Sequence, residues 1–301
     1  MKRIALFLSL TIFAVFAAPA NAQEAASSEA LPFLRYERNP ARAAMAGAGS
    51  ALLVGGSATS AFGSPFAAAA SANKVEAAAS YANWAPSLNS SNNIMAGASV
   101  KLGKSLAVSA AFASDKLSEI SVNGDKFSPS NTIFAGAVSL ALGQSFSLGA
   151  AVNLAKSQLL SDYSVSGTAF DLMLCYRKDA FGVAGGVRSL GGKVGNASLP
   201  TSFNVSGGYG LPVGPVALRM AADADYYFSG NWSAAAGVEA SIMSLVQVRA
   251  GYRLSSEYAV IPSHLSLGLG FSYGPVALDL AYLTASEYLG GTIIVGLNVK
   301  F

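Results

Sequence analysis

The chain has 301 residues, of which 52% are hydrophobic and only 12% are charged, with a formal net charge of +3. Because a soluble domain usually has about 25% charged residues, this composition argues against an ordinary soluble protein. Two of the basic residues lie at positions 2 and 3, so the rest of the chain is nearly neutral and has no positive surface for nucleic acid. We expect no nucleic-acid partner.

The first 22 residues have the features of a secretory signal peptide. Lys2 and Arg3 are followed by an apolar run from Ile4 to Ala18 and by the small-x-small sequence Ala20-Asn21-Ala22. The apolar run is shorter than the ~20 residues that a membrane-spanning helix needs. We therefore predict a signal peptide over residues 1–22, with cleavage after Ala22 and export of the mature chain.

The next segment, residues 23–73, shows no strand alternation and is rich in Ala, Gly and Ser. A segment of this length is too short to build its own hydrophobic core, so it has to pack against another part of the protein. We predict that it forms a plug inside the lumen of the barrel that follows.

From residue 74 onward, the chain divides into segments of about ten residues with a hydrophobic period of two, which is typical of a transmembrane β-barrel. We expect an all-β outer-membrane barrel of about fourteen antiparallel strands over residues 74–301, whose connections alternate between tight periplasmic turns and longer external loops. A closed barrel satisfies all of its backbone groups in lipid. The expected strands lie near residues 74–83, 93–102, 105–113, 131–142, 145–155, 166–177, 180–189, 201–211, 215–226, 231–242, 245–254, 264–273, 275–284 and 291–301.

Charged residues fall on one face of these strands. In the last strand, for example, Asn298 and Lys300 alternate with apolar Leu297 and Val299. A lipid-facing Lys or Arg at mid-depth costs roughly 2–4 kcal/mol, so we expect no charge on the outer face of a strand interior. The inner face is mostly Gly, Ala and Ser, unlike the Lys- and Glu-rich exposed face of a soluble β-sandwich. Aromatic residues near strand ends, such as Trp84, are expected to face the membrane interface.

Ten inner charges are candidate contacts of the plug or of a ligand. They are Asp171, Arg177, Arg188, Arg219, Asp223, Asp225, Glu239, Arg249, Arg253 and Asp279. Together with Glu76, Lys101 and Lys300 on the same face, their two signs nearly balance, whereas a porin for one ion sign would show an excess of one charge. We prefer the interpretation that charge pairs hold a plug.

The sequence shows no catalytic arrangement. The single histidine, His264, lies at the outer end of a strand, with Ser263 adjacent on the opposite face and Ser266 two residues along the same face. Because neither serine is well placed for proton transfer, we interpret His264 as a rim histidine and expect no enzyme. Cys175 is the only cysteine, so neither an intramolecular disulfide nor a cysteine-based metal site is possible.

Three inner carboxylates, Asp223, Asp225 and Glu239, could in principle bind Ca²⁺. Arg219 and Arg249 lie in the same wall and can neutralise them. We therefore expect neither a metal ion nor a cofactor.

Short, glycine-rich motifs occur along most of the mature chain. They are Pro32-Phe33-Leu34, Ala41-Arg42-Ala43-Ala44-Met45-Ala46-Gly47-Ala48-Gly49, Ser166-Gly167-Thr168-Ala169-Phe170-Asp171 leading to Tyr176, Leu199-Pro200 leading to Gly208-Tyr209, Leu267-Gly268-Leu269-Gly270-Phe271 and Leu278-Asp279-Leu280-Ala281-Tyr282. In these motifs the chain resembles the PorV/PorQ-type outer-membrane barrels of the type IX secretion group, which are related in fold to long-chain fatty-acid transporters. It departs from that family at Ser64-Pro65-Phe66, where the family usually has Asn-Pro-Ala.

This resemblance implies a fourteen-stranded barrel with an N-terminal plug and a role in binding or tethering secreted proteins at the outer membrane. We accordingly predict a type IX secretion accessory, with outer-membrane lipid and secreted proteins or secretion components as partners. The alternative is a plugged transporter for hydrophobic small molecules such as fatty acids, with a hydrophobic ligand as its partner. An open porin fits poorly with the plug and the balanced lumen charges.

Overall fold

The computed structural model describes residues 29–86, 91–122 and 125–301. The predicted signal peptide, its cleavage site and residues 23–28 of the predicted plug lie outside this part of the chain. Within it, no helix is both long enough and apolar enough to cross a membrane.

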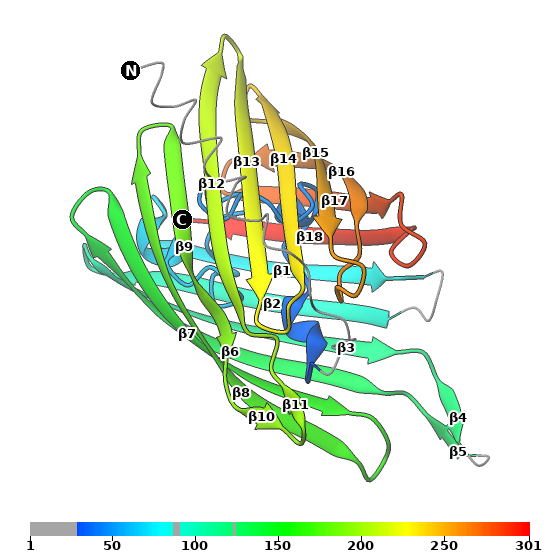
Figure 1. Cartoon of the computed structure of the whole chain (residues 1–301). Coiled ribbons are helices and arrows are strands. Elements are labelled where there is room, and N and C mark those ends of the chain that lie inside the picture. The colour runs from blue at the N-terminus through cyan, green and yellow to red at the C-terminus, as the bar shows by residue number, and fades with distance from the viewer. Residues whose placement is uncertain (1–28, 87–90, 123–124) are drawn as a thin grey trace.

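In the described part of the chain, fourteen antiparallel strands form a closed barrel (Figure 1). β18 pairs with β1, with Lys300 opposite Glu76, and this pairing closes the sheet. The predicted all-β barrel of about fourteen strands is confirmed. The barrel strands are β1 (Val75–Trp84), β2 (Ser91–Leu102), β3 (Leu106–Leu117), β6 (Ser130–Leu142), β7 (Phe146–Gln158), β8 (Ser164–Lys178), β9 (Phe181–Leu190), β12 (Ser202–Val213), β13 (Val216–Tyr227), β14 (Trp232–Ile242), β15 (Val246–Ser255), β16 (His264–Tyr273), β17 (Val276–Thr284) and β18 (Thr292–Lys300).

The two ends of the barrel differ in their connections. One end has tight turns, such as Gly143-Gln144 and Gly274-Pro275, and the C-terminal residue Phe301 lies there beside the first strand. The other end has the longer loops. By the usual arrangement of such barrels, the tight-turn end is periplasmic and the loop end is external. Two loops contain small hairpins, formed by β4 (Ile120–Val122) with β5 (Asp125–Phe127) and by β10 (Lys193–Val194) with β11 (Ala197–Ser198).

Two strands extend farther toward the loop end than the sequence alternation predicts. β3 continues to Leu117 and β7 to Gln158, whereas the alternation predicts ends at residues 113 and 155. The added residues include Lys116 and Lys156, which are exposed and point outward. The expectation of no outward charge within a strand is therefore wrong at these two positions, because both strands continue past the apolar band that excludes charge.

Midway between its two ends, the outward face of the barrel is apolar. The outward side chains of Phe134 and Leu172 are 58% and 57% exposed, while their inward neighbours Ala135 and Met173 are buried. A closed sheet with large apolar side chains exposed all around it is typical of a barrel embedded in lipid.

Residues 29–73, called the plug from here on, lie inside the barrel and run from its loop end to its tight-turn end (Figure 1). At the loop end, the backbone N–H of Ala30 donates to the carbonyl oxygen of Ser198 at 2.8 Å. Directly after the plug, the N–H of Lys74 donates to the carbonyl oxygen of Phe301 at 2.7 Å. The helical turns of the plug are η1 (Pro32–Arg35), α2 (Pro40–Ala43) and α3 (Ala67–Ala70).

Glycines of the wall let the backbone of the plug approach closely. A Cβ atom at Gly251 would lie 2.3 Å from the carbonyl carbon of Met45, and one at Gly149 would lie 2.2 Å from that of Pro65. Only glycine fits such an approach without displacement of the plug. The small side chains of the inner face thus make room for the plug.

The place of Trp84 near a strand end predicts that it faces the membrane interface, but it does not. It is buried inside the barrel and stacks on the ring of Tyr36 in the plug, with 4.9 Å between the ring centroids. The prediction is wrong because the plug supplies an aromatic partner, which the sequence of the strand alone does not reveal.

Candidate functional site

Asp223, on β13, binds a tight bend of the plug. Its carboxylate accepts hydrogen bonds from the backbone N–H of Gly49 at 2.9 Å and from the hydroxyl of Ser50 at 2.7 Å. It also accepts a hydrogen bond from the hydroxyl of Ser206 at 2.8 Å, and that hydroxyl in turn accepts one from the N–H of Ala51 at 3.1 Å. The backbone N–H groups of Gly49 and Ala51 therefore find their acceptors on the wall, whereas the carbonyl oxygens of Gly49 and Ser50 accept hydrogen bonds from the plug itself.

Two arginines of the wall bind carbonyl oxygens of the plug. Nε of Arg253 donates to the carbonyl oxygen of Ala46 at 3.0 Å. Nη1 of Arg177 donates to the carbonyl oxygen of Ala70, at the end of α3, at 3.3 Å. The last carbonyl groups of a helical turn have no partner within the turn, and both arginines supply one.

Glu76 and Lys101 hold the last part of the plug. The carboxylate of Glu76 accepts hydrogen bonds from the N–H of Ser57 at 2.8 Å and from the hydroxyl of Ser71 at 2.6 Å. The ammonium of Lys101 donates to the carbonyl oxygen of Ser71. We call five residues the plug seat: Glu76, Lys101, Arg177, Asp223 and Arg253.

Four other inner charges bind one another and form what we call the wall network: Arg219, Glu239, Arg249 and Asp279. Nε of Arg249 lies 2.7 Å from a carboxylate oxygen of Glu239, and its Nη1 lies 2.5 Å from one of Asp279. Nε of Arg219 lies 3.4 Å from the second oxygen of Glu239. The network joins strands β13, β14, β15 and β17 across the inner face.

The remaining three predicted charges lie together near the loop end. Nη1 of Arg188 is 3.6 Å from a carboxylate oxygen of Asp225. Asp171 accepts a hydrogen bond from the N–H of Ser189 at 2.6 Å. The pairing of β8 with β9 shifts register at Asp171, and such an irregularity redirects side chains next to it.

A cavity lies between these residues and the plug. The wall contributes Asp171, Arg188 and Asp225, and the plug contributes Arg35 and Arg42. The cavity is therefore lined by charged and by apolar side chains. The apolar ones include Leu34, Phe62 and Ile133.

Arg35 is buried at this cavity with unused donor groups. It forms an ion pair with Glu29, and its guanidinium carbon lies 3.3 Å from the centre of the Tyr227 ring. Its Nε and Nη1 atoms are buried and have no hydrogen-bond partner among the described residues. Burial lowers the pKa of Arg35, and the coulombic effects of Tyr227 and Glu29 oppose this shift. A buried cation with unpaired N–H groups is costly, and an anionic ligand would relieve that cost.

The sequence interpretation missed Asp115, because its predicted strand ends at residue 113. Asp115 is buried, its carboxylate lies 3.6 Å from Nη2 of Arg38 in the plug, and it accepts a hydrogen bond from Asn93. Continuing the alternation from Ala111 and Ala113 places Asp115 on the inner face, so the sequence did contain the signal.

His264 is the first residue of β16, at the loop end, where the sequence interpretation places it. It is buried, and its Nδ1 lies 2.8 Å from the carbonyl oxygen of Pro262. Ser263 is bound to Ser255, and the hydroxyl of Ser266 has no hydrogen-bond partner among the described residues. In the same part of the chain, no group of three or more His, Cys, Asp or Glu side chains is placed to hold a metal ion.

Solved structures with a similar fold include a channel and a transporter. CymD, a monoaromatic hydrocarbon channel, matches with a TM-score of 0.64 and 12% identity over 87% of this chain and 97% of its own. The P. putida toluene transporter TodX matches with a TM-score of 0.55 and 12% identity, over 87% and 98%. A Pseudomonas aeruginosa FadL homologue matches with a TM-score of 0.55 and 11% identity, over 87% and 98%. The chain is an outer-membrane β-barrel.

No protein-family model matches the chain, and no curated protein matches it. At 11–12% identity, the likeness to solved structures shows the fold alone. The resemblance to PorV/PorQ-type barrels is therefore supported only as a fold shared with outer-membrane channels. No comparison supports a role in type IX secretion, which stays a prediction from the sequence motifs.

Proposed function

We propose that this barrel is a plugged transporter for small apolar molecules that carry an anionic group, with fatty acids as the model class. The cavity at the loop end is the observation that carries the proposal. Arg35, whose buried Nε and Nη1 atoms have no hydrogen-bond partner among the described residues, lines this cavity together with Leu34 and Phe62. A carboxylate accepts strong hydrogen bonds from a guanidinium, and an apolar chain can lie on the apolar side.

The similar structures support transport, but with other ligands. CymD is a channel for monoaromatic hydrocarbons and TodX is a toluene transporter. Such hydrocarbons carry no charge, whereas the cavity of this chain is lined by several arginines and carboxylates. The charged lining favours an amphipathic ligand. None of these proteins is described as an enzyme, and we propose that this chain is not one.

The plug has to move for a ligand to pass. Its seat consists of hydrogen bonds, each of which contributes roughly 0.5–3 kcal/mol net, depending on whether a charged group takes part. Arg35 belongs to the plug and Arg188 to the wall, and both line the cavity. A carboxylate between them would contact both parts, so its binding can change the position of the plug.

Ligand binding to the purified mature protein tests this proposal. We expect decanoate to bind on the order of tenfold more tightly than decanol, because only decanoate offers a charged acceptor. Arg35→Gln should remove this preference, whereas Arg219→Gln, in the wall network, should keep it. The measurement is isothermal titration calorimetry in lipid nanodiscs. Equal affinity of the unmodified protein for decanoate and decanol would contradict the proposal.

A further inference from the structure

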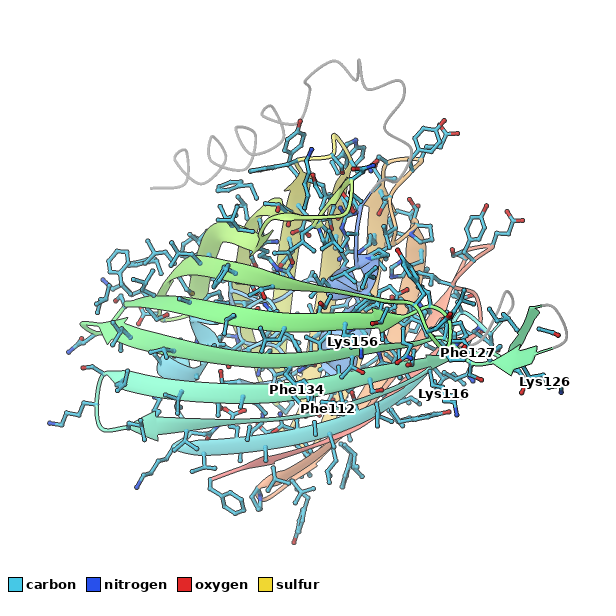
Figure 2. All side chains as sticks on the ribbon, turned by 90° about the horizontal axis from the view of Figure 1, so that it is seen from below. Phe112, Lys116, Lys126, Phe127, Phe134 and Lys156 are labelled. Carbon is cyan, nitrogen blue, oxygen red and sulfur yellow. The ribbon has the colours of Figure 1, made fainter. Side chains whose placement is uncertain are left out.

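The outer surface carries two lysines near the loop end of one part of the wall. Lys116 on β3 and Lys156 on β7 are exposed, while Asp115 and Ser157 beside them are buried inside. β6 lies between β3 and β7, and the lysines are offset by two residues along the strands, because Lys116 is opposite Ser130 and Lys156 is opposite Thr132. Two strand spacings with this offset put their Cα atoms roughly 12 Å apart. Figure 2 shows both lysines on this side of the barrel, toward the β4–β5 hairpin that carries Lys126.

These two lysines differ from the rest of the outer surface. Among the described outward positions of the barrel strands, the only other charged residue is Lys178, at the tight-turn end of β8. The ion pairs of the described residues do not include Lys116 or Lys156. Lys126, by contrast, pairs with Glu119 at 2.9 Å. The positive charge of this part of the outer wall is therefore not neutralised by the described residues.

The outward residues around the lysines follow a clear order along the strands. Toward the middle of the barrel lie Phe112 and Phe134, whose ring centroids are 5.0 Å apart (Figure 2). Closer to the loops, at the level of the lysines, the outward side chains carry hydroxyl or amide groups. They are Ser114, Ser130, Thr132, Gln158, Ser164 and Ser166.

We propose that this surface, named the lysine surface for Lys116, Lys156 and their hydroxyl-bearing neighbours, binds the phosphates of a phosphorylated glycolipid in the outer leaflet, of the lipid A type. Its order of apolar rings, hydroxyl groups and cations matches the acyl chains, sugars and phosphates of such a lipid. Each ammonium donates charge-assisted hydrogen bonds to a phosphate, and its aliphatic stem lies along the wall. Two cations on one face select a lipid with several negative charges over a phospholipid with one.

Native mass spectrometry of the full mature protein tests this inference with three added lipids: bisphosphorylated lipid A, the same lipid without phosphates, and phosphatidylglycerol. We expect the unmodified protein to retain bisphosphorylated lipid A. Replacing both lysines of the lysine surface, Lys116→Gln with Lys156→Gln, should lower the bound fraction about fivefold, which corresponds to about 1 kcal/mol. Lys116→Arg with Lys156→Arg should keep it, because the charges remain.

The matched control is Lys126→Gln with Lys178→Gln, which removes the same charge from the hairpin and from the opposite end of the barrel. We expect this control to bind lipid A as the unmodified protein does, and a heat-shifted band on gels checks that every variant is folded. An equal loss in the control would overturn the proposal, as would equal retention of the lipid without phosphates. Equal binding of phosphatidylglycerol would overturn the choice of a glycolipid.

Discussion

The wall network and the plug seat lie in the same lumen but bind different partners. In the wall network, Arg249 bridges Glu239 and Asp279, so charged groups of neighbouring strands satisfy one another. In the plug seat, Asp223 instead accepts hydrogen bonds from Gly49 and Ser50 of the plug. Both sets of charges alternate with apolar residues along their strands, and nothing in that alternation separates them.

Because of this difference, the stability of the barrel and the position of the plug should depend on different residues. Loss of a wall-network charge leaves its buried partner unpaired within the sheet, so it should reduce the stability of the barrel. Loss of a plug-seat charge removes no ion pair of the sheet, so it should weaken the position of the plug more than the stability of the barrel. Substitutions in each set can test this separation.

The largest effect is expected for Glu239→Gln. Glu239 is 2% exposed and pairs with both Arg219 and Arg249, and removing one partner of a buried ion pair costs about 3–5 kcal/mol. Reversible unfolding by urea in lipid vesicles measures this cost. The control, Glu119→Gln, removes an exposed charge paired with Lys126 and should cost less than about 1 kcal/mol. Similar costs for the two variants would show that the network does not stabilise the barrel.

The next effect tests which face of the wall is in lipid. Leu278 is 53% exposed on the outer face, whereas its neighbour Asp279 binds Arg249 inside. Leu278→Arg should cost roughly 2–4 kcal/mol of folding free energy in the same vesicle assay, and Asp279→Asn about 1–3 kcal/mol. A tolerated Leu278→Arg together with a severely destabilised Asp279→Asn would mean that the facing assignment is reversed.

A smaller effect on folding, but a specific effect on closure, is expected for Asp223→Asn. The amide is a weaker acceptor than the carboxylate for the donors of Gly49 and Ser50, so the plug should leave its seat on the order of tenfold more often. Single-channel recording in planar bilayers measures the open fraction. Glu239→Gln serves as the comparison and should not raise it. If Asp223→Asn destabilised the barrel without more frequent opening, the distinction between seat and network would be lost.

The strands and their facing could be predicted because lipid imposes a strict rule on them. β18 is expected over residues 291–301 and is observed over Thr292–Lys300, since each outward charge in the apolar band would be costly. Outward charges are no longer excluded where a strand extends beyond the apolar band that faces the lipid. β3 and β7 continue beyond it, and for this reason the sequence interpretation missed Asp115 on one face and Lys116 and Lys156 on the other.

The contacts of the plug could not be predicted in the same way. Most of them join a side chain to a peptide group, as Asp223 binds Gly49 and as Ser139 binds the N–H of Ala69, and a sequence does not say which peptide group lies opposite. The cavity at Arg35 depends on the path of the whole plug. Its donors are visible in the sequence, but their burial without partners is not.

We predict that the plug is a separable part, which closes a barrel that folds without it. Deletion of residues 23–60 removes most of the plug, including the bend at Gly49 and Arg35 at the cavity, and leaves every barrel strand in place. Single-channel conductance in planar bilayers, measured on folded protein, is the decisive quantity. We expect the deletion variant to conduct ions far more readily than the intact protein. A folded deletion variant whose conductance equals that of the intact protein would contradict this account.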